Sequence, residues 1–217
     1  YAMIARNWIR GEASFTRPTV DLLQAGQKGW HLLELPLSAY LAGYGWHLCG
    51  GSLDAWGRGV AIACSAVSVG LMFALVRRWH DEESAWMASL VLALSPVSII
   101  YGQMFMLEAS VVTLTLLSLW SFDQYLVSQR RWALPLGLAS SLALVATKVY
   151  LIVIVGVVVV HALRTMRLGS SRRRALQVIG GLILAMLPVA MWIAEVFAVA
   201  ADPQLAPRIY FSLADST

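Results

Sequence analysis

Five ionisable residues in this sequence have the side-chain types that phosphate and proton-transfer chemistry requires. They are two acids, two cations and a histidine: Glu34, Glu108, Arg58, Lys148 and His31. Arg and Lys bind phosphate through charge-assisted hydrogen bonds, and a carboxylate can remove the proton from an attacking hydroxyl or amine. These types predict a site that holds a lipid-linked phosphate and activates an acceptor, with the two Glu residues as catalytic candidates and the other three as binding candidates.

Each residue also has an explanation that involves no chemistry. Arg58 could extend to lipid headgroups, Glu34 could cap the helix entered at Pro36, and Lys148 could anchor a helix at the membrane interface. Glu108 fits such an explanation least, because it follows 24 uncharged residues. Both explanations stay open at the level of the residues alone.

The composition shows which elements must position these residues. Of 217 residues, 59% are hydrophobic and 13% are charged, and the mean hydropathy is +0.70. This balance excludes a water-soluble enzyme and a disordered chain, and two cysteines are too few for a disulfide scaffold. The sequence therefore predicts an all-α polytopic membrane protein.

Runs of uncharged residues predict about six transmembrane helices. They are 59–76, 84–107, 109–122 with its continuation to 129, 132–147, 149–163 and 175–194. About 20 helical residues cross the roughly 30 Å of hydrocarbon. A single helix over 132–163 would be about 48 Å long, too long for one crossing. We therefore expect the chain to turn near Lys148.

Arginine-rich loops predict the orientation. The loops after the first, third and fifth expected spans hold nine of the sixteen Lys and Arg residues, and such loops face the cytoplasm. The five candidate residues would then lie on the opposite side. The expected organisation is an extracytoplasmic first loop at 1–57 with juxtamembrane helices, a transmembrane module at 58–198, and the start of a further extracytoplasmic segment at 199–217.

The first 57 residues predict two amphipathic helices that lie along the membrane surface. Residues 1–9 carry apolar side chains at helical spacing and are followed by Gly11. A second helix would begin after Pro36 and end at Gly50 and Gly51. Surface helices rich in Trp are typical of an enzyme that acts on a lipid headgroup.

Several short motifs, taken in order, resemble the GT-C membrane glycosyltransferases. They are YAMIARNWIRG at 1–11, ELPLSAYL at 34–41, GR at 57–58, SP at 95–96 and YGQMFMLE at 101–108. The chain is most similar to the group that contains protein O-mannosyltransferases and the lipid A aminoarabinose transferase. Each motif is weak alone, and their order carries the resemblance.

The resemblance implies a GT-C-like fold and an activity. Such enzymes move a sugar from a polyprenyl-phosphate carrier to an acceptor on the extracytoplasmic side. It puts Glu34 near the sugar phosphate, Glu108 in the second outer loop, and Arg58 and Lys148 at basic positions of the family. Gln103 stands where many relatives carry Arg, so a phosphate contact is lost or moved here.

The resemblance also implies a catalytic acid and one more span ahead of Tyr1, so the chain is expected to be a fragment of a longer cell-envelope enzyme. The expected partners are membrane lipids, a lipid-linked sugar donor, and an acceptor glycan, lipid or protein, with no nucleic acid. The sequence supplies no metal-ligand set, so we assign no metal site, although some branches of the superfamily use a divalent metal.

We expect transfer with inversion at the anomeric carbon, in the bacterial inner membrane. Two other classes stay open at this stage. One is a transporter or flippase for a lipid or small solute, and the other is a non-catalytic assembly subunit.

Overall fold

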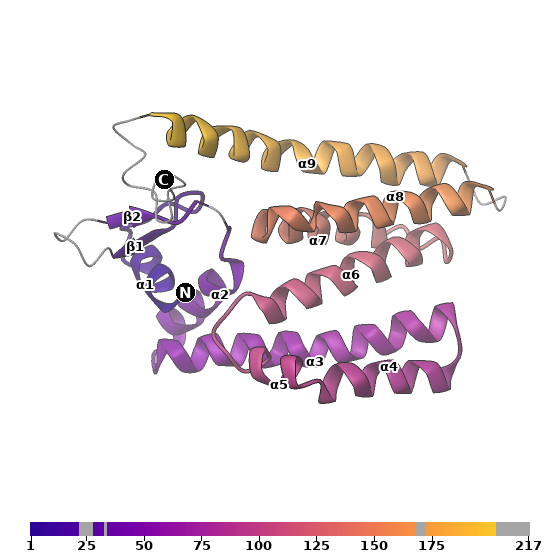
Figure 1. Cartoon of the computed structure of the whole chain (residues 1–217), viewed down its shortest axis with the longest axis horizontal. Helices are drawn as coiled ribbons and strands as arrows, with labels where there is room; N and C mark the ends of the chain where they lie inside the picture. The colour runs from indigo at the N-terminus through magenta and orange to yellow at the C-terminus, as the bar shows by residue number, and fades with distance from the viewer. Residues whose placement is uncertain (22–27, 33, 168–171, 203–217) are drawn as a thin grey trace, which may run out of the picture.

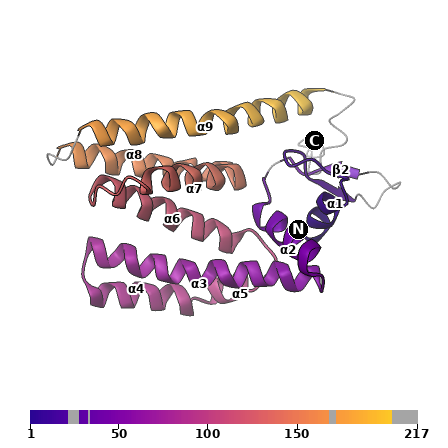
Figure 2. The ribbon, with the colours of Figure 1, turned by 180° about the vertical axis from the view of Figure 1, so that it is seen from behind.

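The computed structural model describes residues 1–21, 28–32, 34–167 and 172–202. Helices α3 to α9 run roughly along one long axis, and α1, α2 and two short strands gather at one end of them (Figure 1, and from behind in Figure 2). The elements are α1 (Ala2–Ile9), β1 (Thr19–Asp21), β2 (Lys28–Trp30), α2 (Leu37–Cys49), α3 (Leu53–Trp79), α4 (Glu82–Leu94), α5 (Pro96–Tyr101), α6 (Glu108–Leu126), α7 (Ala133–Thr147), the 3-10 turn η1 (Val149–Leu151), α8 (Ile152–Arg167) and α9 (Arg172–Ala201).

Three of the described helical segments are long and apolar enough to cross a membrane. They are Leu53–Trp79, Val149–Met166 and Arg172–Ala201. The apolar helix Ala133–Thr147 is shorter, with 15 residues, and would extend about 22 Å at 1.5 Å per residue. The protein is therefore a helical integral membrane protein, but of the six expected spans only these three meet that standard.

The uncharged run 84–107, predicted to be one span, is not one helix. Helix α4 ends at Leu94, and the short α5 begins at Pro96. Proline has no amide hydrogen and disfavours the helical conformation in the residue before it, and Ser95 has an extended ψ of 128°. The length of the uncharged run does not show this break, whereas Pro96 within it does.

The chain turns at Lys148 as predicted. Helix α7 ends at Thr147, and Lys148 is extended, with φ −145° and ψ 103°. The turn η1 then leads into α8. A long apolar segment is thus divided into two helices, and the charged side chain of Lys148 lies at their junction.

The region 1–57 contains both predicted helices, α1 and α2. Gly11 and Gly50 follow them with φ of 72° and 71°, a conformation that glycine adopts readily. The region also contains an antiparallel hairpin in which Thr19 pairs with Trp30. The all-helical expectation is wrong for these strands, because three-residue strands are too short for an alternating pattern to be recognised.

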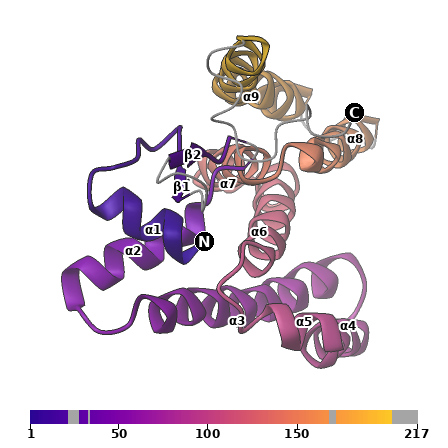
Figure 3. The ribbon, with the colours of Figure 1, turned by 60° about the vertical axis from the view of Figure 1, so that its left-hand side comes forward.

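The hairpin and α1 are joined by polar contacts. Asn7 donates from Nδ2 to Oδ1 of Asp21 at 3.0 Å and to the carbonyl oxygen of Thr19 at 3.3 Å. Arg6 forms an ion pair with the same aspartate. Helices α1 and α2 pack against each other and beside the first turns of α3 (Figure 3).

The helical region has its main core where α6, α7, α8 and α9 meet. Phe122 and Val178 are fully buried there. Small polar residues let two neighbouring helices approach closely, as between Ser118 and Ser141, whose hydroxyl oxygens are 2.6 Å apart. The division into regions 1–57, 58–198 and 199–217 stays a prediction, and residues 203–217 of the last lie outside the described residues.

The loop between α5 and α6 packs closely on α3. A Cβ atom at Gly57 would lie 2.1 Å from Cγ of Phe105, so the aromatic ring occupies the space that any side chain at position 57 would fill. Gly59, two residues further along α3, has nothing within 4 Å of an added Cβ.

Replacing Gly57 by Ala should destabilise the protein, because the ring and the loop that leads to α6 must shift. We expect the free energy of unfolding to fall by about 1–3 kcal/mol, the usual cost of overpacking. Thermal melting of the full-length protein in detergent measures the change. The matched variant Gly59→Ala should melt at or slightly above the wild-type temperature, and equal losses in both variants would contradict the close packing of Phe105.

Candidate functional site

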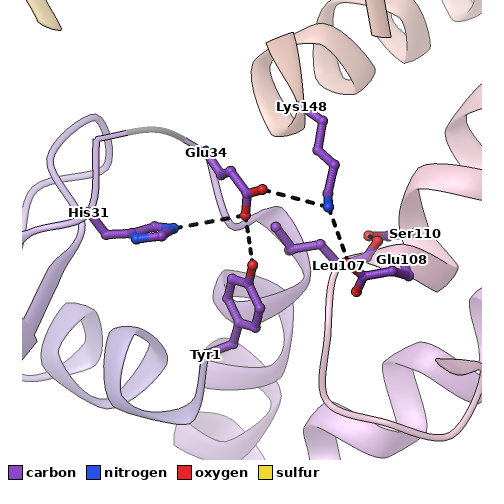
Figure 4. Close-up of polar contacts among 7 residues, drawn as sticks. All are labelled: Tyr1, His31, Glu34, Leu107, Glu108, Ser110 and Lys148. Carbon is purple, nitrogen blue, oxygen red and sulfur yellow. Dashed lines mark hydrogen bonds and ion pairs between the residues drawn. The ribbon is translucent and has the colours of Figure 1, made fainter. Parts of the chain in front are cut away.

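Four segments of the chain bring five polar side chains together at one end of the bundle. Figure 4 shows Tyr1, His31, Glu34, Glu108 and Lys148 in one network. Four of the six candidates from the sequence analysis are in it, and Tyr1 is an addition. We call these five residues the Lys148 cluster.

Glu34 reaches the cluster because its neighbour is fixed to the bundle. The amide of Leu35 donates to the carbonyl oxygen of Ala146 at 3.0 Å. The Leu35 side chain packs against Val145 and Val189, from α7 and α9. The outer loop is thereby attached to the last turn of α7, two residues before Lys148.

The ammonium of Lys148 lies between two carboxylates. Its Nζ donates to Oε1 of Glu108 at 3.1 Å and is 3.6 Å from Oε1 of Glu34. Burial alone would lower the pKa of Lys148, but the hydrogen bond with Glu108 and the attraction of both carboxylates raise it above its usual range. Lys148 is therefore protonated and positively charged at neutral pH.

Glu34 has partners at both carboxylate oxygens. The Tyr1 hydroxyl donates to its Oε2 at 2.7 Å, and Nε2 of His31 is 3.8 Å from the same oxygen. His31 lowers the pKa of Glu34 most; Tyr1 and Lys148 add to this effect, and burial opposes it. Glu34 is consequently ionised at neutral pH and is a weak base.

Glu108 differs from Glu34 in that one of its oxygens is available. It is the first residue of α6, where the helix dipole favours a negative charge. Its Oε1 binds Lys148, whereas its buried Oε2 has no hydrogen-bond partner among the residues that the structure describes. A ligand hydroxyl could satisfy this oxygen.

A cavity of about 810 Å³ extends from the cluster between α3, α4 and α6. Glu108, Lys148 and Gln103 line its polar part, together with Tyr150. Its other walls are mostly apolar side chains from Ile62, Val69, Leu92, Val97, Val111 and Val112. An elongated apolar ligand with a charged or polar end matches these apolar walls and the polar groups at one end.

Arg58 is not brought into the Lys148 cluster. It lies in the second turn of α3, is mostly exposed, and donates from Nε to Oδ2 of Asp54 at 2.9 Å, one helical turn earlier. The sequence analysis placed Arg58 beside Glu34 and Glu108, and the arrangement of the side chains gives it a different partner.

Tyr1 is the site residue that the sequence analysis missed. The first motif predicts Tyr1 only as part of the apolar face of a helix. Burial raises the pKa of the Tyr1 hydroxyl most, and the hydrogen bond to Glu34 and the negative charges of Glu34 and Glu108 raise it further. The sequence signal for Tyr1 as a site residue was its position at the start of a short amphipathic helix.

In residues 1–21, 28–32, 34–167 and 172–202, no three His, Cys, Asp or Glu side chains come together as ligands. In the Lys148 cluster the two carboxylates are bridged by an ammonium group.

Comparison with known families agrees with this geometry. Residues 34–192, most of the chain, match the family described as dolichyl-phosphate-mannose-protein mannosyltransferase. The chain belongs to this mannosyltransferase family. No curated protein and no solved structure was found to match it.

Membership of the mannosyltransferase family makes this protein a membrane glycosyltransferase that uses a lipid-linked sugar donor. The matched residues begin at Glu34 and include Glu108 and Lys148. The resemblance inferred from the order of the motifs is thereby confirmed.

The lowered pKa of Glu34 predicts how stability depends on pH. A carboxyl whose pKa is lower in the folded state stabilises the fold at pH values above its unfolded value of 4.5, and this contribution is lost as the pH falls through the folded pKa. Tyr1→Phe in the full-length protein removes one cause of the lowering. We expect the variant to melt below the wild type at pH 7 and the difference to disappear in acid.

The control for this experiment is Tyr44→Phe, at an exposed position of α2. It should leave the pH dependence of melting unchanged. A Tyr1→Phe protein whose melting temperature follows the wild type at every pH would show that the hydroxyl does not stabilise the Glu34 carboxylate.

Proposed function

We propose that the Lys148 cluster transfers a sugar from a polyprenyl-phosphate carrier to an acceptor outside the cytoplasm, with inversion at the anomeric carbon. The observation that carries this proposal is the position of the Lys148 ammonium, between two carboxylates and at the polar part of an apolar cavity. The carrier has a matching structure, because its anionic phosphate is joined to a long apolar chain.

Lys148 would bind the phosphate of the donor and stabilise its departure. The bond from the anomeric carbon to the phosphate oxygen breaks, and its electron pair stays with the phosphate. A fixed cation beside the developing charge lowers the barrier most where water is excluded. The raised pKa of Lys148 supports this role, because the ammonium stays protonated at neutral pH.

Glu108 would interact with the reacting hydroxyl groups. In the transfer, the acceptor oxygen forms a bond to the anomeric carbon and loses its proton to a carboxylate. Glu108 is the better candidate of the two acids, because its Oε2 has no hydrogen-bond partner in the part of the chain that the structure describes. It could alternatively orient a sugar hydroxyl while another acid takes the proton.

Glu34 would act mainly by positioning. Its lowered pKa makes it a poor proton acceptor, and its Oε1 lies 3.6 Å from Lys148. Tyr1 and His31 hold its other oxygen.

Gln103 and Arg58 would contact the substrate from the rim of the site. Gln103 lines the cavity and is neutral where many relatives carry Arg, so the phosphate charge would fall mainly to Lys148. Arg58 is exposed, and a bound anion can replace Asp54 as its partner, because exposed ion pairs are weak.

The sidedness follows from the charges at the other end of the helices. The arginines at the end of α3, between α6 and α7, at the end of α8 and at the start of α9 lie at the opposite ends of these helices from the Lys148 cluster. Under the positive-inside rule this supports an extracytoplasmic site in the bacterial inner membrane. The acceptor would be a glycan, lipid or protein on that side.

Removing the charge of Lys148 tests its role directly. Lys148→Gln in the full-length protein should lower the rate of sugar transfer about 10²–10³-fold, the usual cost of losing one group that stabilises transition-state charge. The rate is measured in membranes with a defined polyprenyl-phosphate sugar and normalised to protein abundance. Lys148→Arg should recover part of the loss.

Arg10→Gln is the matched control, since it removes an exposed cation from the same outer region. It should transfer at close to the wild-type rate. If Lys148→Gln retained full transfer at normal abundance, Lys148 would not neutralise the leaving phosphate, and the proposed site would be wrong.

Direct displacement predicts the stereochemistry of the product. The acceptor attacks from the face opposite the phosphate, so a β-linked donor should yield an α-linked product. NMR of the product with a donor of known configuration measures the outcome. Retention, or a glycosyl group trapped covalently on Glu34 or Glu108, would be incompatible with a single displacement.

A further inference from the structure

A second cavity lies toward the other end of α8, away from the Lys148 cluster. It has a volume of about 730 Å³ and is formed by the end of α3, the middle of α6 and one face of α8. Its residues are Trp79, Leu119, Phe122, Val153, Gly156, Val157, Val158, Val160, His161 and Arg164. None of them is part of the Lys148 cluster.

The α8 wall is an apolar stripe with open space beside it. Val153, Gly156, Val157 and Val160 recur at intervals of three and four residues, which places them on one helix face. The Val153 and Val160 side chains are 62% and 51% exposed. A Cβ added at Gly156 would meet nothing within 4 Å, so the stripe is hollow in its middle.

Arg164 continues this stripe and provides a cation at its end. Among the described residues, no side chain is found in an ion pair or hydrogen bond with the Arg164 guanidinium. The neighbouring cation Arg78 is already occupied, because its Nε donates to Oδ2 of Asp123 at 2.5 Å.

Asp123 also engages the other polar groups near the cavity. Its Oδ1 accepts from Nε1 of Trp79 at 3.1 Å and is 3.4 Å from Nε2 of His161. With only 3% of its side chain exposed, Asp123 is committed to these protein partners. Arg164 is the cation of the described cavity lining that an external anion can reach.

The charges near this end favour an anion. The helix ends and the α6–α7 turn near this end carry Arg77, Arg130, Arg131, Arg172, Arg173 and Arg174, against the acids Asp81, Glu82 and Glu83. Trp79 lies here as well, and Trp is enriched where a membrane meets water. From Val153 to Arg164 the helix rises about 16 Å at 1.5 Å per residue, close to half of the roughly 30 Å hydrocarbon thickness.

We propose that this cavity binds one anionic glycerophospholipid of the membrane leaflet opposite the catalytic cluster. Arg164 binds the lipid phosphate, and an acyl chain lies along Val153, Gly156, Val157 and Val160. The length of the stripe matches the chains of one leaflet, and the excess of Arg matches the headgroup charge. This lipid is a structural ligand and takes no part in sugar transfer.

The experiment is competitive lipid binding to the full-length protein, measured by native mass spectrometry in detergent. Phosphatidylglycerol and phosphatidylcholine with identical acyl chains are offered in equal amounts. The wild type should retain more phosphatidylglycerol. Arg164→Gln should reduce this preference about fivefold, the effect of one Arg near a charged membrane surface, and Arg131→Gln, an equal loss of charge outside the cavity, should change it little.

A second variant tests the apolar part. Gly156→Leu places a side chain in the open space beside α8 and should reduce the retention of both lipids. If this protein melts below the wild type, Val157→Ser replaces it, since Val157 is half exposed. Arg164→Gln then tests the headgroup and the α8 variant tests the acyl chain.

Three results would overturn the proposal. Equal effects of Arg164→Gln and Arg131→Gln would indicate a general attraction to the basic surface. Unchanged lipid retention in a stable α8 variant would show that no acyl chain occupies the stripe. A dimer that dissociates in both cavity variants, with no lipid retained by the wild type, would assign the surface to a second copy of the chain.

Discussion

The site depends on the ion pairs that the Lys148 ammonium forms with Glu34 and Glu108. An unpaired charge at the edge of a hydrocarbon region is costly, and two carboxylates from distant segments offset that cost here. The outer loop supplies Glu34, the first turn of α6 supplies Glu108, and the break between α7 and η1 supplies Lys148. The same contacts that join the outer loop to the bundle therefore assemble the residues proposed to act on the donor.

Breaks in helices give this membrane protein its functional end. Pro96 divides α4 from α5, and the extended conformation of Lys148 divides α7 from η1. At the second break the chain places the Lys148 ammonium near the end of the bundle where α1, α2 and the two strands lie. Continuous helices over these stretches would have carried the same side chains into surroundings without partners, where an ionised group is least tolerated.

The two carboxylates of the Lys148 cluster suit different roles, because their hydrogen-bond partners differ. Glu34 has partners at both oxygens and a lowered pKa, so it suits the positioning of a cation. Glu108 keeps one oxygen without a partner among the described residues. At the other end, Asp123 has engaged Arg78 and His161 in the same way, which leaves Arg164 for a ligand. In both places a carboxylate whose oxygens are occupied by protein partners leaves a neighbouring polar group available to a ligand.

The sequence by itself determined the class of the protein, the turn at Lys148 and the existence of α1 and α2, and it named four residues that the structure brings together in one cluster. These follow from apolar length, helical periodicity, turn residues and the order of family motifs, which are local properties of the chain. It did not determine that Arg58 pairs with Asp54, that Tyr1 binds Glu34, or that Thr19–Asp21 and Lys28–Trp30 pair as antiparallel strands. Only the tertiary structure decided these, because they depend on which side chains approach within hydrogen-bonding distance after α1, the hairpin and α7 have packed together, and no spacing along the chain encodes that approach.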